Sequence, residues 1–479
     1  MHNVRTKTKI VATLGPSSSD YDTIKKLIEA GVSMFRINTS HGTKEEHAEK
    51  IRIIRQLTAE MGLYIPIMID LQGPKIRVGE LAKPVEIKKG ETIILQHMSK
   101  EQEGIIPVDY SGIANDVKTG EKILLDDGKV GLRVVKISDK KVYATVEHGS
   151  LIKPRKGINI PCAQSSLDSV TKRDKEYIKF ALEQEADYLA LSFVRKAEDV
   201  QCARYYMKAY GDVEIPLIAK IEKPQAVDNL EEILKVADGI MVARGDLGIE
   251  MSPQEVPIAQ KRIIKLTNIH KKPCIVATQM LESMMEEPIP TRAEASDVAN
   301  AIYDGTDAIM LSGETAAGEY PVEAVKMMAL ISQTVETSQF LHTDYDVDLI
   351  SELNPVSQAI SGSSVNIAKK LGAKGILIFT EKGYTPPIIS KLKPSVPIIV
   401  VTNCEKTARK LNLYWGIFSY VAKECTGVLD EALFNRIDEL LMQRVQFKKG
   451  DDIVIVNSVP KIMSGTINTI RVHKIGDTQ

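Results

Sequence analysis

Apolar and polar positions along this chain follow two different patterns in turn. Before residue 72, helix-like patterns alternate with apolar runs at residues 9–15, 32–38 and 65–70. This alternation predicts strands joined by helices, as in a parallel α/β sheet. From residue 72 to about residue 168, the pattern changes to short β-branched runs separated by turn residues. That change predicts an inserted all-β unit.

The strand–helix alternation returns after residue 171, with apolar runs at 188–194, 215–222, 239–246, 273–278 and 308–312. Together with the three strands before the insert, these make eight strand–helix units, the number that closes a (β/α)8 barrel. An open doubly wound sheet would show the same alternation. We favour the barrel because polar residues stand at the carboxyl end of nearly every strand, where barrel enzymes place their active sites.

The last part of the chain repeats the alternation on a smaller scale, after a polar stretch at residues 342–348 that reads as a linker. Strands are expected at residues 375–379, 398–401, 452–456 and 470–474. The expected organisation is therefore a TIM barrel, an inserted β-barrel domain and a C-terminal α/β domain. Their expected bounds are residues 1–72 with 169–340, residues 73–168, and residues 352–479.

Composition narrows the classes of function. Of the 479 residues, 43% are apolar and 26% are charged, which is ordinary for a soluble globular protein. The formal net charge of -1 gives no general attraction to nucleic acids or membrane surfaces. The start lacks the apolar core of a signal peptide, and no apolar run approaches a membrane span. The five scattered cysteines include no CxxC pair, so we expect a reduced, cytoplasmic protein without disulfides or zinc.

Two neighbouring strands of the predicted barrel have charged residues at their carboxyl ends. Ile218-Ala-Lys-Ile-Glu222 delivers Lys220 and Glu222, and Met241-Val-Ala-Arg-Gly-Asp-Leu-Gly248 delivers Asp246. Two carboxylates at adjacent strand ends suit Mg²⁺, which prefers oxygen ligands and leaves positions for substrate. Lys220 lies on the same side of its strand as Glu222 and is placed to neutralise a transferring phosphoryl group. Salt bridges between loops are the alternative interpretation.

These motifs, in this order, resemble the pyruvate kinase family, and the resemblance covers almost the whole chain. It implies phosphoryl transfer from phosphoenolpyruvate to ADP, giving pyruvate and ATP, with Mg²⁺ or Mn²⁺ as cofactor. It also implies a homotetramer and an insert that closes as a lid. Three further strand-end motifs support it: Phe35-Arg-Ile-Asn-Thr-Ser-His-Gly42, Ala277-Thr-Gln-Met-Leu-Glu-Ser283 and Leu311-Ser-Gly-Glu-Thr-Ala316.

The resemblance assigns roles to the matching positions. Glu222 and Asp246 would hold the metal ion, while Lys220 and Arg36 would bind the phosphoryl group, a task suited to the forked donors of arginine. Backbone N–H groups near Gly245 and Asp246, at a helix start, would bind the substrate carboxylate.

A second set of roles concerns proton transfer and the nucleotide. Thr278, with Ser312 nearby, would orient a proton relay to the enolate carbon, because a hydroxyl is itself a poor acid. A purely structural residue remains the alternative for His41. The positions that match the nucleotide side are Thr13, His41, Arg77 and Lys156.

The segment after Asp70 departs from the usual family pattern. Leu71-Gln-Gly-Pro-Lys75 stands where K⁺-requiring members typically have Thr-Lys-Gly-Pro-Glu. An ammonium therefore replaces a carboxylate near the monovalent-cation site and can take over the electrostatic role of the cation. We predict activity without K⁺, and the alternative is that Lys75 is a solvated loop residue. The positions that match the cation ligands are Asn38, Ser40, Asp70 and Leu71.

The loop at residues 379–385 follows a predicted strand and offers the hydroxyls, backbone N–H groups and ammonium of a phosphate cradle. In the family this loop belongs to an allosteric site for sugar phosphates or nucleotides. The residues differ from the usual Ser-Gly-x-Thr-Ala-Arg, so the identity of a phosphorylated effector stays open, and a structural loop is the alternative. The residues concerned are Thr380, Lys382, Gly383 and Thr385.

Two other functions fit part of the sequence. A Mg²⁺-dependent barrel lyase or aldolase acting on pyruvate enolate would also place paired acids at strand ends. It gives no reason for the insert, the basic residues of the nucleotide side or Lys220. A metabolite sensor that has lost catalysis would be expected to lack Lys220, Glu222, Asp246 or Thr278, and all four are present. The sequence therefore favours a pyruvate kinase.

Overall fold

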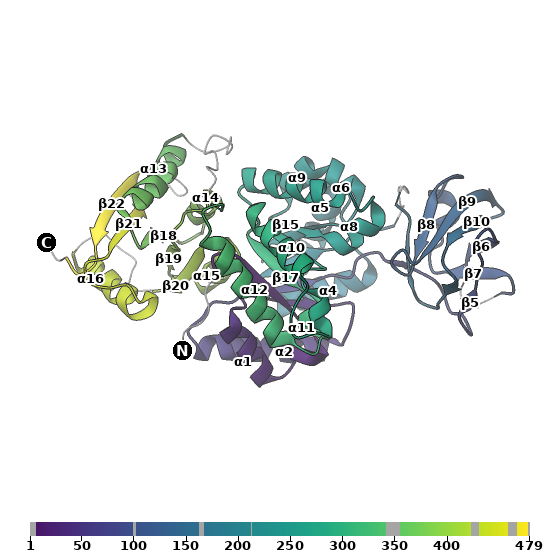
Figure 1. Cartoon of the computed structure of the whole chain (residues 1–479), viewed down its shortest axis with the longest axis horizontal. Helices are drawn as coiled ribbons and strands as arrows, with labels where there is room; N and C mark the ends of the chain where they lie inside the picture. The colour runs from purple at the N-terminus through teal and green to yellow at the C-terminus, as the bar shows by residue number, and fades with distance from the viewer. Residues whose placement is uncertain are drawn as a thin grey trace.

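Three units follow one another along the long axis of the molecule (Figure 1). The C-terminal α/β unit lies at one end, a barrel with its helices lies in the middle, and the inserted β unit lies at the other end. The computed structural model describes residues 6–98, 102–161, 167–211, 213–341, 355–422, 431–457 and 467–477. The polar stretch expected as a linker at residues 342–348 lies outside the described residues.

The central unit is a closed barrel of eight parallel strands. β1 pairs with β2 on one side and with β17 on the other, which closes the sheet. The (β/α)8 prediction is confirmed, and the open-sheet alternative is wrong. The strands, in their order around the barrel, are β1 (Lys9–Leu14), β17 (Ala308–Leu311), β16 (Cys274–Ala277), β15 (Gly239–Ala243), β14 (Leu217–Ile221), β13 (Tyr188–Leu191), β3 (Ile67–Asp70) and β2 (Met34–Asn38).

Helices cover the outside of the barrel, and local capping explains where several of them begin. The Asp20 carboxylate accepts a hydrogen bond from the backbone of Thr23, and Thr43 and Glu46 form a reciprocal capping box. The larger helices of this layer are α1 (Tyr21–Ala30), α2 (Lys44–Glu60), α4 (Lys172–Glu183), α5 (Ala197–Tyr210), α7 (Leu230–Val236), α9 (Val256–Ile269), α10 (Arg292–Tyr303) and α12 (Pro321–Glu336).

Two barrel strands are shorter than their apolar runs predict. β13 ends at Leu191, and Phe193 has a φ of 55°, a left-handed conformation that cannot continue a strand. β15 ends at Ala243, and the following residues form the short helix α8 (Arg244–Glu250) rather than more strand. In both places the chain leaves the strand direction at the carboxyl end of the barrel, where the candidate site lies.

The insert forms a seven-stranded sheet with its own apolar core. A bridge between Val78 and Val108 links the two edges of this sheet, as expected for a β-barrel-like unit. The sheet order is β4 (Ile76–Arg77), β12 (Gly157–Asn159), β8 (Lys122–Leu125), β9 (Val130–Ser138), β10 (Lys141–His148), β6 (Thr92–His97) and β7 (Ile105–Val108). A separate pair is formed by β5 (Val85–Glu86) and β11 (Leu151–Ile152).

The C-terminal unit is a five-stranded sheet in which only the last strand is antiparallel. Its order is β20 (Ile417–Val421), β19 (Ile398–Thr402), β18 (Gly375–Phe379), β21 (Asp452–Asn457) and β22 (Thr469–Lys474). The helices of this unit are α13 (Pro355–Leu371), α14 (Thr385–Lys391), α15 (Glu405–Leu411) and α16 (Glu431–Leu440). Across the described ranges, the structure contains no helix with the length and hydropathy of a membrane span.

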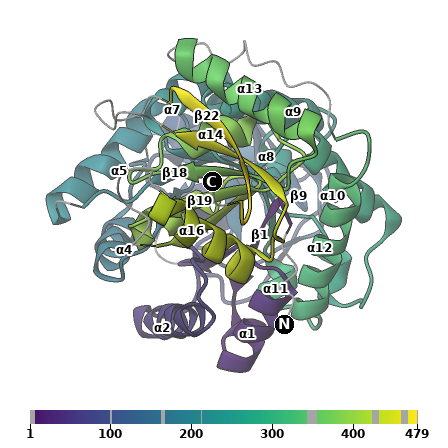
Figure 2. The same ribbon diagram turned by 90° about the vertical axis from the view of Figure 1, so that its left-hand side faces the viewer.

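The C-terminal unit packs on the end of the barrel where the strands begin, and it covers that end in the view of Figure 2. Leu413 is fully buried in the cluster inside the barrel, together with Met34 and Met68. The Arg409 guanidinium lies 2.8 Å from the carboxylate of Asp187, which directly precedes β13. This packing closes the amino end of the barrel and leaves the carboxyl end for the site.

Candidate active site

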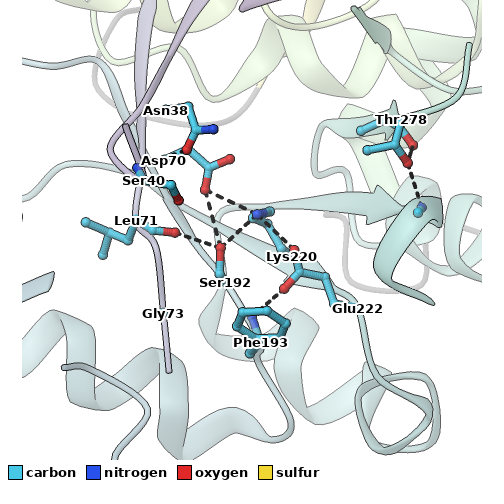
Figure 3. Close-up of polar contacts among 12 residues, drawn as sticks. Asn38, Ser40, Asp70, Leu71, Gly73, Ser192, Phe193, Lys220, Glu222 and Thr278 are labelled. Atoms are coloured by element: carbon cyan, nitrogen blue, oxygen red, sulfur yellow. Dashed lines mark hydrogen bonds and ion pairs between the residues drawn. The ribbon is translucent and has the colours of Figure 1, made fainter. Parts of the chain in front are cut away.

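Lys220, on β14, is the centre of a buried polar cluster at the carboxyl end of the barrel (Figure 3). Its ammonium lies 2.8 Å from the Glu222 carboxylate and 3.3 Å from the Asp70 carboxylate. It also donates a 2.7 Å hydrogen bond to the hydroxyl of Ser192. The side chains come from three neighbouring strand ends, so the closed barrel brings them together.

Asp70 connects this cluster to the next strands around the barrel. The Nε of Arg36 lies 2.6 Å from the Asp70 carboxylate, and another guanidinium nitrogen donates to the Thr13 hydroxyl at 3.1 Å. Thr13 in turn donates to the carbonyl of Leu311 at 2.9 Å. Two cationic side chains, Arg36 and Lys220, are therefore held beside one another by a shared carboxylate.

Burial and ion pairing set the charges in this cluster. Burial alone would lower the pKa of Lys220, but Asp70 and Glu222 raise it above its ordinary value. Burial would raise the pKa of Asp70, but Lys220 and Arg36 hold it below its usual range. Burial raises the pKa of Glu222 to about 7, with Asp246 adding to the effect and Lys220 opposing it. The cluster therefore keeps Lys220 charged.

Glu222 and Asp246 fit a divalent cation of the magnesium type. The Asp246 charge acts on Glu222 strongly enough to help raise its pKa, and an added cation would relieve that repulsion. One oxygen of Glu222 accepts from the backbone N–H of Phe193 at 2.6 Å, which orients the carboxylate. Within the described residues, no group of three or more His, Cys, Asp or Glu side chains is arranged to hold a metal ion, so substrate oxygens and water would complete the coordination by these two carboxylates.

Thr278 stands at the end of β16, apart from the Lys220 cluster in Figure 3. Its hydroxyl accepts a 2.7 Å hydrogen bond from the backbone of Gly245 and donates one of 2.6 Å to the carbonyl of Ala277. Thr278 has a φ of 71°, and the next residue, Gln279, has a φ of 53°. Strained backbone of this kind persists where the surroundings impose it and is concentrated at functional sites.

The neighbouring strand end adds a second hydroxyl. Ser312 follows β17, and its backbone N–H donates to the Glu314 carboxylate at 2.7 Å. The Ser312 hydroxyl is buried and has no hydrogen-bond partner among the residues that the structure describes. A buried hydroxyl without a partner is costly, and a substrate or water bound here would remove that cost.

The four residues expected to bind a monovalent cation lie together. The backbone N–H of Ser40 donates to the Asn38 side chain at 3.1 Å, and the Leu71 carbonyl accepts from Ser192 at 2.7 Å, beside Asp70. Lys75 is not in contact with this group. Its side chain lies against Gly157 of β12, and no hydrogen bond or ion pair in the described ranges joins it to the four residues.

The four residues expected on the nucleotide side are dispersed. Thr13 is buried beside Arg36, whereas His41 is exposed in the loop after β2. Arg77 and Lys156 belong to the insert, where Arg77 donates to the carbonyl of Arg155 at 3.3 Å and Lys156 lies 3.0 Å from Asp126. These contacts hold both cations within the insert.

The loop expected to bind an effector connects β18 to α14. The Thr380 hydroxyl accepts a 3.0 Å hydrogen bond from the backbone of Gly383, which has a φ of 81°. Lys382 is exposed, and Thr385 is buried at the start of α14. The left-handed Gly383 makes this turn possible, because other residues adopt that conformation at a cost.

Comparisons with known proteins agree with this geometry. The family model described as "Pyruvate kinase, barrel domain" matches residues 5–325, and the one described as "Pyruvate kinase, alpha/beta domain" matches residues 358–473. The chain belongs to the pyruvate kinase family. It is therefore a phosphotransferase with a TIM barrel, and its family acts on phosphoenolpyruvate and ADP with a divalent metal such as Mg²⁺.

Several bacterial proteins named pyruvate kinase match nearly the whole chain. The one from Thermotoga maritima is 44% identical over 98% of this chain and 99% of its own length. The one from Agrobacterium vitis is 41% identical over 98% of this chain and 97% of its own length. The one from Geobacillus stearothermophilus is 42% identical over 99% of this chain and 81% of its own length. These matches favour the kinase over the lyase and sensor alternatives.

Two contributors to this candidate site were not among the residues expected from the sequence. Ser192 binds Lys220 and the Leu71 carbonyl, and Phe193 provides the backbone N–H that orients Glu222. Ser192 could have been found from its position, because it is the first polar residue near the end of the apolar run at residues 188–194. No signal was available for Phe193, because its main chain rather than its side chain is used.

Proposed function

We propose that this chain transfers the phosphoryl group of phosphoenolpyruvate to ADP at the Lys220 cluster, with a divalent cation held by Glu222 and Asp246. The observation that carries the proposal is one buried ammonium held between the carboxylates of Asp70 and Glu222 at the carboxyl end of the barrel. Phosphoryl transfer needs positioning and positive charge more than covalent chemistry, and this arrangement supplies both. The contacts described above support these roles.

In the proposed reaction, Lys220 and Arg36 bind oxygens of the phosphoryl group and stabilise its charge during transfer. Their shared partner Asp70 fixes the distance between them. The divalent cation, when bound, supplies further positive charge beside the phosphoryl and enolate oxygens. Gly245 and Asp246, at the start of α8, are the proposed binding groups for the substrate carboxylate.

The enolate left after transfer receives a proton on its methylene carbon. We assign Thr278 and Ser312 to orient the relay that delivers this proton. Thr278 has both hydrogen-bonding functions of its hydroxyl engaged, whereas the Ser312 hydroxyl lacks a partner within the described residues. Ser312 is therefore the hydroxyl that is ready to bind a water, and Thr278 holds the backbone of Gly245.

The enzyme is tested by pyruvate formation from phosphoenolpyruvate and ADP after chelation of divalent ions. Activity should be absent with EDTA and restored by Mg²⁺ or Mn²⁺. A Glu222→Gln variant should need a much higher Mg²⁺ concentration than the unchanged chain. Full activity in EDTA, or an unchanged Mg²⁺ requirement in the variant, would contradict the proposed metal site.

We also propose that the enzyme works without K⁺, with Lys75 in place of the monovalent cation. Its flexible stem leaves the chain five residues after Asp70, and Lys75 lines a small cavity together with Phe193, whose backbone binds Glu222. The proposal requires its ammonium to reach the cation ligands, because in this structure the side chain lies against Gly157. The reversal of charge relative to the usual glutamate supports the proposal.

The potassium proposal predicts opposite behaviour in two proteins. In tetramethylammonium buffer, the unchanged chain should lose less than about twofold in kcat, since a lysine charge does not depend on added salt. Lys75→Glu should be nearly inactive there and should recover when K⁺ is added. Strong activation of the unchanged chain by K⁺ would show that Lys75 does not replace the cation.

The remaining proposals concern regulation and assembly. We propose that a phosphorylated effector binds at Thr380, Lys382, Gly383 and Thr385, supported by the hydroxyl and backbone groups of that loop. We propose a cytoplasmic homotetramer, and exposed apolar side chains such as Ile258 and Ile289 support an interface between copies. Its mass in solution, measured by light scattering, should be four times that of the chain.

The division of labour follows the three units. We propose that residues 1–72 with 169–340 form the catalytic barrel and that residues 73–168 form a lid. Residues 352–479 would then form the regulatory domain. The separate apolar cores of the insert and the C-terminal unit support this division.

A further inference from the structure

The turn at the carboxyl end of β16 has a strained backbone. Thr278 and Gln279 follow one another there with φ values of 71° and 53°. Glycine adopts this left-handed conformation readily, but a β-branched residue such as threonine rarely does. Such a conformation persists only where the surrounding structure imposes it. Contacts from outside the turn must therefore hold it in place.

Arg244, the first residue of α8, binds this turn through its side chain. One terminal nitrogen of the guanidinium donates to the carbonyl of Thr278 at 2.7 Å and to the carbonyl of Gln279 at 3.2 Å. A hydrogen bond from a charged donor is stronger than one between two neutral groups. A single cation therefore holds the carbonyls of both left-handed residues.

A carboxylate on α10 holds the arginine in turn. The other terminal nitrogen of Arg244 lies 2.7 Å from both carboxylate oxygens of Asp297. The Nε of Arg244 is buried and has no hydrogen-bond partner in the described part of the chain. A buried donor without a partner carries a cost. The arginine is therefore kept in this position by the contacts of its two terminal nitrogens.

The next residue of α8, Gly245, holds the same turn by the hydroxyl of Thr278. The backbone N–H of Gly245 donates to that hydroxyl at 2.7 Å. A Cβ added to Gly245 would lie 3.3 Å from the hydroxyl oxygen, which is closer than ordinary contact, so the glycine permits this approach. Two consecutive residues of α8 thus bind Thr278 independently, Arg244 by its backbone and Gly245 by its side chain.

We propose that Arg244 is a positioning residue for proton delivery. The substrate carboxylate takes the N–H of Gly245 and thereby frees the Thr278 hydroxyl for the proton relay. Arg244 keeps its hold on the backbone carbonyls during this exchange, so the strained turn does not relax when the hydroxyl leaves Gly245. Arg244 itself touches no reacting atom. The inference rests on the proposed role of Thr278 and adds the residue that keeps it in place.

The test is a double-mutant cycle in kcat, measured as pyruvate formation at saturating phosphoenolpyruvate, ADP and Mg²⁺. Thr278→Ala and Arg244→Gln should each lose at least about tenfold, because proton delivery is worth that much or more. In the Thr278→Ala background, Arg244→Gln should cost less than about a further twofold, since the hydroxyl that it positions is already absent. The KM for ADP should change by less than about twofold in Arg244→Gln, whereas a general loss of structure would raise it.

Asp297→Asn tests the same inference without removing the arginine, and it decides the matter if Arg244→Gln does not fold. Loss of the carboxylate charge should loosen the guanidinium and lower kcat by about threefold or more. This loss should also disappear in the Thr278→Ala background. Ser296→Ala, at an exposed position of the same helix, is the matched control and should behave like the unchanged chain.

Two results would overturn the inference. Losses that multiply in the double variant would show that Arg244 acts on something other than Thr278. Full activity of folded Arg244→Gln, or of Asp297→Asn where the first variant does not fold, would show that the turn holds without this clamp. Full activity of Thr278→Ala is a separate outcome, because it would remove the proposed role of Thr278 and the inference with it.

Discussion

At the scale of single residues, the protein keeps charges buried by giving each one several partners. Lys220 has two carboxylates and a hydroxyl around it. Asp307, before β17, is fully buried and is bound by the ammonium of Lys391 and by the backbone of Cys274. Removing one partner of such a group leaves an uncompensated charge, which costs more than the pair contributes.

Lys393 gives a residue-scale prediction about pH. It is buried beside Asp307, and burial lowers its pKa to about 7 although Asp307 opposes the shift. The unfolded chain, with an ordinary lysine pKa of 10.5, therefore binds more protons than the folded chain between pH 7 and 10.5. The contribution of Lys393 to the free energy of unfolding therefore increases as pH rises, by up to about 1.4 kcal/mol per pH unit.

Urea unfolding of the unchanged chain and of Lys393→Met at pH 7, 8 and 9 measures this contribution. The difference between the two proteins should change steadily in favour of the unchanged chain as pH rises. Other titrating groups are the same in both proteins and cancel in the difference. Parallel pH dependences would show that Lys393 is charged when folded throughout this range.

At the scale of elements, α8 links the active site to the insert. Gly245 and Asp246 lie at its start, and Glu250 is buried at its end. One oxygen of Glu250 accepts from Asn159 of β12 at 2.7 Å and from Lys223 at 3.0 Å. Because Asn159 belongs to the insert, this carboxylate fixes the insert against the helix that carries the proposed metal ligand.

Asn159→Ala should therefore loosen the insert without touching a reacting group. We expect faster hydrogen exchange in β12, a loss of about 1–3 kcal/mol in stability and a several-fold higher KM for ADP. The change in kcat should be smaller. Asn115→Ala, an exposed amide elsewhere in the insert, is the matched control. An unchanged exchange rate in β12 would show that this contact does not hold the insert.

At this scale, the sequence predicted the barrel strands but not every residue of the candidate site. Apolar runs predicted all eight barrel strands, because strands covered on both sides are continuously apolar. Lys220 and Glu222 were predicted together because residues two apart share one face of a strand. The early end of β13 was missed, because a left-handed Phe193 has no signature in the pattern. Ser192 was missed because one hydroxyl beside an apolar run is common.

At the scale of the whole molecule, the C-terminal unit covers the amino end of the barrel. Leu413 is fully buried in a cluster with residues of all eight barrel strands. Asp187 pairs with Arg409, and Asp307 pairs with Lys391. The sequence predicted both units but not this contact, because apolar periodicity does not say which partner covers a side chain. The position of Lys75 against the insert escaped prediction for the same reason.

Leu413→Ala tests whether the C-terminal unit stabilises the amino end of the barrel. The substitution should leave a cavity inside the amino end of the barrel and cost about 2–5 kcal/mol, measured by urea unfolding. Leu371→Ala, on an exposed leucine at the end of α13, should cost little and serves as the control. A loss of less than about 1 kcal/mol at Leu413 would mean that the barrel end closes without the C-terminal unit.

The most direct test of the central claim is pyruvate formation by Lys220→Met, measured with saturating phosphoenolpyruvate, ADP and Mg²⁺. Because we propose that this buried ammonium stabilises the transferring phosphoryl group, we predict a loss of at least about a thousandfold in kcat, a size known for loss of a transition-state contact. Lys179→Met, an exposed lysine on α4, should keep full activity, and circular dichroism should show both variants folded. A folded Lys220→Met protein with more than about a tenth of normal kcat would contradict the account.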